Sequence, residues 1–162
     1  MESNQTENQP QFAIQRIYIK DLSFETPNTP AIFKAEWQPE MNVDLNTQAN
    51  PLDKDVYEVE LRITVTAKLQ DKVAYVAEVK QAGIFTLSGF EDDQLKAMLG
   101  SFCPNILFPY VREGIADVIN RGSFPQFNLA PINFDALYLE HLQQQAQTVQ
   151  NSENETSGAI TH

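Results

Sequence analysis

Histidine and cysteine, the side chains that most often bind metals or act as nucleophiles, are rare in this sequence and stand alone. The histidines are His141 and His162, and neither has a second ligand at the spacing that a metal site needs, so we predict no metal site. Cys103, the only cysteine, precedes Pro104 and has no histidine near it in the sequence. We interpret it as a small buried apolar residue and not as a nucleophile.

Carboxylates are numerous, but none has a sequence context that predicts acid–base chemistry. Asp92 and Asp93 open a predicted helix, where they complement the positive end of its dipole. The other candidates belong to a predicted turn and to the solvated face of a predicted strand: Asp53, Asp55, Glu58 and Glu60. A general acid or base needs a pocket that raises its pKa, and nothing in the sequence indicates one. The glycines form no phosphate-binding loop. Because none of these residue types indicates a reactive site, we expect no catalytic residue, no cofactor and no enzyme.

Aromatic residues in irregular segments need another explanation. The chain has 10 Phe and 5 Tyr, and several aromatic residues lie in or near expected loops: Phe33, Trp37, Phe124 and Phe127. Ile32, Phe33 and Trp37 stand close together after two prolines. They either pack under a loop as a satellite of the core or form an apolar binding patch. In a chain this acidic, loop aromatics favour a binding surface.

The element that must position these residues is a sheet. Residues 57–69 alternate apolar and polar side chains at every step, which predicts a strand with one buried face. A half-buried strand implies an antiparallel sheet with cover on one side. The other predicted strands are residues 12–25, 41–46 and 73–87, with a turn at QANPLDKD. The first has apolar residues on both faces, which is typical of a strand between layers or at a subunit interface.

From residue 88 the apolar period becomes helical. Ser88 and Glu91 fit a capping box, and residues 100–104 are expected to interrupt the helix that follows. A longer helix is predicted over residues 106–121, ending at Gly122 as the residue after the helix, and Pro109 either starts or kinks it. A last helix is predicted from residue 133 or 134 to residue 144. Strands followed by helices predict an α+β fold, a four-stranded antiparallel sheet with helices packed on one face.

Composition narrows the possible partners. Lys and Arg number 11 and Asp and Glu number 22, a net charge of −11, which argues against nucleic acid and anionic membrane surfaces. One cysteine permits no internal disulfide. The first residues do not resemble a signal peptide, and no run reaches transmembrane length. We therefore expect a cytoplasmic protein that does not insert into membranes.

Four stretches occur together in this order: IQRIYIKDLSFETPN, QAGIFTLSG, CPNILFPYVRE and RGSFPQFNLAPINFDALYL. They resemble SecB, the family of bacterial protein-export chaperones, and CPNILFPY and FPQFNLAPINFDAL are long and specific. The resemblance covers nearly everything in residues 12–145, which we predict to be a SecB-like domain. Residues 1–11 and 146–162 are polar and are predicted to be a disordered arm and a disordered tail.

The resemblance implies a function and its partners. Family members hold unfolded secretory preproteins in the cytosol without nucleotide and deliver them to SecA, the translocase motor. They are homotetramers built as dimers of dimers. The fold that the resemblance implies agrees with the sheet and helices predicted from the sequence pattern.

The resemblance also implies two sites. Family members bind clients in long apolar grooves, and the matching positions here are Phe24, Ile32, Phe33, Trp37, Phe134, Leu137, Tyr138 and Leu142. The SecA-binding surface of the family maps onto Asp21, Glu25, Val76 and Glu78. A larger leucine can stand in relatives at the position of Val76, so its smaller side chain would weaken the apolar part of that contact. Alternation independently places Val76 and Glu78 on the outward face of their strand.

Two other classes of protein stay open from the sequence. A small-ligand carrier using the same apolar groove would saturate with a fatty acid and ignore unfolded protein. An enzyme built on Asp and Glu residues would need one carboxylate with a strongly raised pKa inside a cleft.

Overall fold

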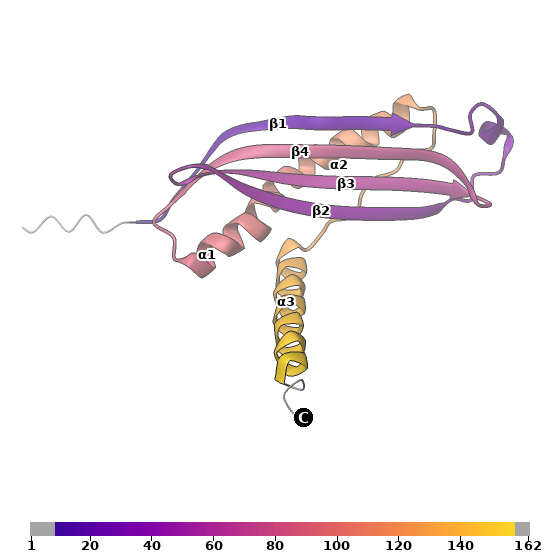
Figure 1. Cartoon of the computed structure of the whole chain (residues 1–162). Coiled ribbons are helices and arrows are strands. Elements are labelled where there is room, and N and C mark those ends of the chain that lie inside the picture. Colours follow the sequence, from indigo (N-terminus) through magenta and orange to yellow (C-terminus); the bar gives the residue numbers. More distant parts are fainter. Residues whose placement is uncertain (1–8, 158–162) are drawn as a thin grey trace, which may run out of the picture.

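The computed structural model describes residues 9–157, and its main element is one antiparallel sheet of four strands in the order β1-β4-β3-β2 (Figure 1). The strands are β1 (Gln11–Glu25), β2 (Glu40–Asp53), β3 (Val56–Leu69) and β4 (Lys72–Ser88). The predicted fold class is confirmed, because helical segments after β4, chiefly the long helix α2 (Cys103–Arg121), pack on one face of this sheet.

The core lies between the odd-numbered side chains of β3 and β4 and the long helix α2. Val59, Leu61, Ile63 and Val65 of β3 are fully buried, as their alternation predicts. In a strand, side chains two residues apart share a face, so one face of β3 is apolar and the other polar. Burying each of these side chains stabilises the fold by about 1.5–3 kcal/mol.

β1 corrects the prediction that both of its faces are apolar. Its pairing with β4 skips one residue between Ile14 and Arg16 and another between Ile19 and Asp21. Each bulge reverses the face on which the next side chains lie. The apolar residues at even and odd positions therefore all pair with odd-numbered residues of β4, on the helix-covered face: Phe12, Ile14, Ile17, Ile19, Leu22 and Phe24.

β2 is longer than the sequence pattern predicts. The predicted turn at QANPLDKD is wrong in its first part, since β2 pairs with β3 as far as Asp53. The turn is confined to Lys54 and Asp55, and Asp55 has a positive φ of 58°. β3 provides an uninterrupted partner, so polar residues with little strand propensity of their own are drawn into an edge strand, where Pro51 is tolerated.

The predicted interruption at residues 100–104 is also wrong. α1 (Asp92–Ala97), the π-helical turn η2 (Met98–Phe102) and α2 (Cys103–Arg121) follow one another without a break. The Cys103 N–H donates to the Met98 carbonyl, a wider turn that accommodates Pro104, which lacks an N–H. Pro109 lies inside α2, so it does not start the helix.

Both predicted helix caps shift. α1 is capped at Glu91, whose N–H donates to Gln94 Oε1 at 3.4 Å, and not at Ser88, which still belongs to β4. α2 does end at Gly122, but Gly122 has an ordinary φ of −77°, and Ser123 takes the positive φ. Glycine is needed at 122 for space: a Cβ there would lie 2.5 Å from the ring of Phe24.

The last helix, α3 (Phe134–Ser157), extends well beyond the predicted end at residue 144. Figure 1 shows α3 projecting away from the sheet. All side chains of residues 139–155 are exposed. Helical structure thus replaces the predicted disorder over residues 146–157, while residues 1–8 and 158–162 of the predicted arm and tail lie outside the described residues.

A group of four ionisable side chains ties β1 to β3 across the outer face of the sheet. Lys20 Nζ lies 2.9 Å from Glu58 Oε1 and also bonds Glu60, and the Tyr18 hydroxyl donates to Glu58. Lys20 is the residue that the second bulge of β1 leaves without a pairing partner in β4. The hydroxyl of Tyr18 and then the ammonium of Lys20 lower the pKa of Glu58.

We predict that Lys20→Met lowers the free energy of unfolding by about 1 kcal/mol at neutral pH, because Glu58 and Glu60 lose their counter-charge. A carboxylate whose folded pKa is lowered stabilises the fold above its unfolded pKa and loses this effect as the pH falls through the folded pKa. The difference between wild type and variant should therefore shrink in acid. Urea denaturation at several pH values measures it.

Lys80→Met is the matched control, since Lys80 lies on the same face and has no ion pair among the described residues. Equal losses of unfolding free energy in the two variants would contradict the prediction. A loss in Lys20→Met that does not change with pH would contradict it as well.

Candidate functional site

Aromatic rings from three separate parts of the chain meet beneath the connection between β1 and β2. Phe124, from the loop after α2, is their centre: its ring centroid lies 5.0 Å from Tyr75, 5.2 Å from Phe33, 5.6 Å from Trp37 and 6.3 Å from Phe24. We call these five residues the crossover cluster. Such distances are typical of favourable aromatic pairs.

The crossover cluster has a buried base and an open rim. Tyr75 and Phe124 are buried, Phe24 and Trp37 are half-buried, and Phe33 is 50% exposed. The rings therefore pack on the core, as the satellite interpretation predicts, and Phe33 also presents apolar surface to solvent. Neither Tyr75 nor Phe124 was among the predicted groove residues, although Phe124 stood out as a loop aromatic.

The segment that carries the rim is unevenly anchored. Asn28 Nδ2 donates to the Val73 carbonyl at 2.8 Å, and the short 3-10 helix η1 (Ala31–Lys34) follows, with Ile32 buried. Beyond it, residues 36–39 bond only to one another, through Gln38 N–H to the Glu36 carbonyl and their side chains. Trp37 is consequently held by ring packing and not by its backbone.

The predicted groove residues of α3 form a second group. Phe134 is buried with its ring 5.9 Å from Phe108, and Tyr138 packs so closely on Gly100 that a Cβ there would lie 2.6 Å from its ring. Ser101 donates to Asp135, which fastens the start of α3 to η2. The remaining two, Leu137 and Leu142, are 41% and 39% exposed.

The structure thus divides the eight predicted groove residues between two places. Phe24, Ile32, Phe33 and Trp37 lie at or beside the crossover cluster, and the other four lie on α3, which packs on η2. The loop over residues 122–133 connects the two places, and Figure 1 shows it running from the end of α2 to the start of α3. No aromatic ring pair among residues 9–157 joins the two groups.

The predicted acidic surface is brought together on the outer face. Glu25 pairs with Val76, Ser23 with Glu78, and Asp21 with Lys80, on neighbouring strands β1 and β4. The Thr64 hydroxyl donates to Glu78 at 2.7 Å and fixes that carboxylate. We call Asp21, Glu25, Val76 and Glu78 the acidic patch. The bulge at Lys20 reverses the change of face made by the first bulge, so Asp21 and Glu25 lie on the same face as Val76 and Glu78.

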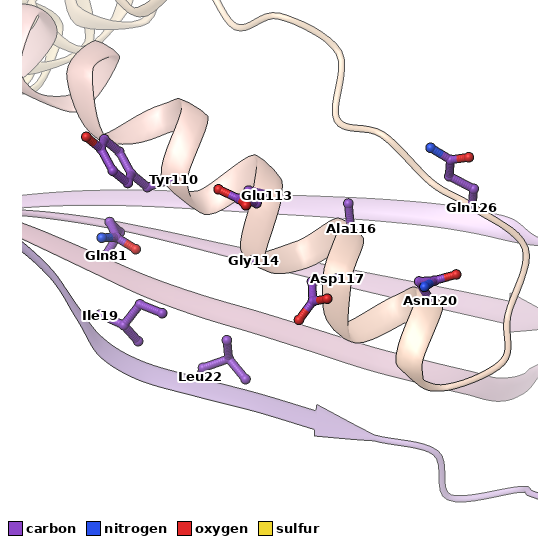
Figure 2. A pocket seen from close by; sticks show the side chains of 10 residues that line it. All are labelled: Ile19, Leu22, Gln81, Tyr110, Glu113, Gly114, Ala116, Asp117, Asn120 and Gln126. Atoms are coloured by element: carbon purple, nitrogen blue, oxygen red, sulfur yellow. The ribbon is translucent and has the colours of Figure 1, made fainter.

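Between β1 and α2 lies an open groove of about 660 Å³ that the sequence did not indicate (Figure 2). Ile19 and Leu22 of β1 line one side, and Tyr110, Glu113 and Asp117 of α2 line the other. Ile19 and Leu22 are 56% and 40% exposed although they lie on the helix-covered face, because α2 packs over β3 and β4.

Other chemistry has little structural support. Within residues 9–157, no three His, Cys, Asp or Glu side chains are placed to hold a metal ion, and no helix is long and apolar enough to span a membrane. Cys103 is fully buried, and burial raises the pKa of its thiol to about 12. The thiol stays protonated, which confirms the interpretation of Cys103 as a small apolar residue.

Comparisons with known proteins identify the family. Residues 5–145 match the family model described as preprotein translocase subunit SecB. The protein-export protein SecB of Marinobacter nauticus is 56% identical over 139 residues, covering 86% of this chain and 84% of the relative. A SecB-like chaperone of Mycobacterium tuberculosis, solved in complex with a peptide from the HigA1 antitoxin, shares the fold with a TM-score of 0.61 and a sequence identity of 17%. The superposition covers 75% of this chain and 90% of that chain.

Together, the family match, the fold and the aromatic site define a protein-export chaperone and not an enzyme. The chain belongs to the SecB family.

Proposed function

We propose that this chaperone binds unfolded secretory preproteins in the cytoplasm, without ATP or another cofactor, and that the crossover cluster is its principal contact with them. The observation that supports this most is an apolar rim, Phe33 and Trp37, above buried rings on a segment with few backbone bonds. An extended apolar segment can bind there through side-chain pockets. Phe134, Leu137, Tyr138 and Leu142 extend the groove along α3.

Delivery is proposed to occur at the acidic patch. Asp21, Glu25 and Glu78 surround Val76 on the outer face, away from the crossover cluster. A basic partner segment would meet three carboxylates and an apolar centre, and several exposed charges on one patch speed encounter and set the register of binding. The family resemblance provides the partner, the zinc-bearing basic tail of SecA.

We also propose a homotetramer, a dimer of dimers. β1 is a sheet edge with unpaired backbone groups, and edges of this length normally receive cover. The exposed apolar side chains beside it, Ile14, Ile19 and Leu22, belong to the groove side of the molecule. The sequence pattern indicated apolar residues on both faces of this strand as the reason for a subunit interface. In the structure, the Ile, Leu and Phe side chains of β1 all lie on one face.

The central test is capture of an unfolded protein. Trp37→Ala should weaken binding of a chemically unfolded secretory protein by about 1–3 kcal/mol, the range for losing a buried aromatic anchor. Because Trp37 is the only tryptophan, its fluorescence should also change when client is added to the wild type.

Leu52→Ala, which truncates an exposed apolar residue of β2 outside the crossover cluster, is the control. The groove assignment fails if Trp37→Ala binds client as the wild type does and the wild-type fluorescence stays constant. Saturation by a fatty acid, with no binding of unfolded protein, would instead favour a small-ligand carrier.

For delivery, Asp21→Lys combined with Glu78→Lys should abolish binding of the SecA tail and leave client binding intact, because the crossover cluster lies elsewhere. Raised salt should weaken the wild-type contact in the same direction. Isothermal titration with the tail peptide measures both effects.

Asp92→Lys combined with Asp93→Lys makes the same charge change on α1 and should leave tail binding near the wild-type value. Wild-type affinity in the acidic-patch variant would remove this surface from the proposal.

For assembly, light scattering at micromolar concentration should give a mass four times that of the 18.3 kDa chain. Ile19→Asp combined with Leu22→Asp should reduce this mass, whereas Leu52→Asp should not. The net charge of −11 per chain implies that low salt loosens the assembly through self-repulsion. A wild-type mass near one chain would rule out the tetramer.

A further inference from the structure

Tyr75 is the one residue of the crossover cluster that carries a hydroxyl group. It is 0% exposed, and its hydroxyl has no hydrogen-bond partner among the described residues. Buried hydroxyls are normally paired, because an unpaired one loses its bonds to water and gains nothing in exchange. A phenylalanine would fill the same space among Phe24, Trp37 and Phe124 without this cost.

Trp37 covers Tyr75 from a segment with few hydrogen bonds. Its ring stacks on that of Tyr75 at a centroid distance of 6.2 Å with an interplanar angle of 20°. Among the described residues, the hydrogen bonds of residues 36–39 run only between Glu36 and Gln38. Asn28 holds the other end of the crossover to Val73, so displacing Trp37 would not require the crossover to detach.

The hydroxyl is suited to donate a hydrogen bond. Burial raises the pKa of Tyr75 to about 12, so the group keeps its proton throughout the neutral range. The rings around it lack conventional hydrogen-bond acceptors. An acceptor on a bound ligand would therefore not have to displace another acceptor from the Tyr75 hydroxyl. The group that every unfolded segment provides, whatever its sequence, is the main-chain carbonyl.

We propose that Tyr75 is a client-binding residue: when a client displaces Trp37, the Tyr75 hydroxyl donates a hydrogen bond to a main-chain carbonyl of the bound extended segment. The surrounding rings contact side chains, while the Tyr75 hydroxyl fixes the position of the backbone. This inference rests on the proposed function and assigns to the site a polar contact that does not depend on client sequence.

Tyr75→Phe tests it with two effects of opposite sign. In the free protein, removing an unpaired hydroxyl should raise the melting temperature. In the complex, the same change removes a hydrogen bond, and the Kd for reduced, carboxymethylated α-lactalbumin should rise about three- to tenfold. Tyr75→3-fluorotyrosine keeps the ring and makes the hydroxyl a stronger donor, so it should lower the Kd.

Tyr57→Phe is the matched control and should leave the Kd unchanged. Tyr57 of β3 lies on the same face of the sheet as Tyr75 but at the opposite end of the β3–β4 pairing. A Tyr75→Phe variant that binds as tightly as the wild type overturns the inference and leaves the proposed function standing. If the wild type itself does not bind the unfolded protein, the proposed function fails and the inference fails with it.

Discussion

One face of the sheet has to be covered, and the covering determines where everything else lies. The odd-numbered side chains of β3 and β4 are buried against α2, with Val79, Phe85 and Leu107 fully enclosed. Gly83 and Gly114 let strand and helix approach closely, since a Cβ at Gly83 would lie 3.2 Å from Leu107 of α2 and one at Gly114 3.2 Å from Val79 of β4. α2 reaches β3 and β4 but leaves much of β1 uncovered, and the groove of Figure 2 is the result.

The two bulges of β1 separate the surfaces of the molecule. Without them, strict alternation would place Ile17 and Ile19 on the outer face with Asp21 and Glu25. With them, the outer face carries the acidic patch and the Lys20 group, and all the Ile, Leu and Phe side chains of β1 lie on the other face. A charged surface and an apolar surface therefore lie on opposite faces of one strand.

The crossover cluster combines a stable base with a loosely held rim. Tyr75 and Phe124 belong to the core, whereas Trp37 is attached through ring contacts that are individually worth about 0.5–1.5 kcal/mol beyond burial. Contacts of that size can be exchanged for similar contacts with an incoming chain. The sheet beneath would keep the base in position during such an exchange, since β4, which carries Tyr75, pairs with β1 on one side and β3 on the other.

The sequence by itself determined the strands β3 and β4, the α+β class and the family, because unbroken alternation and long specific motifs depend only on neighbouring residues. The four residues that the resemblance assigns to the acidic patch lie on one face of the structure. Tertiary structure decided that Ile17 and Ile19 lie on the helix-covered face, since a bulge depends on pairing with β4 and leaves no local pattern. The continuous helix through Pro104, the extent of β2 and the meeting of Tyr75 with Phe124 likewise depend on contacts between residues far apart in the chain, which a reading of local periodicity does not contain.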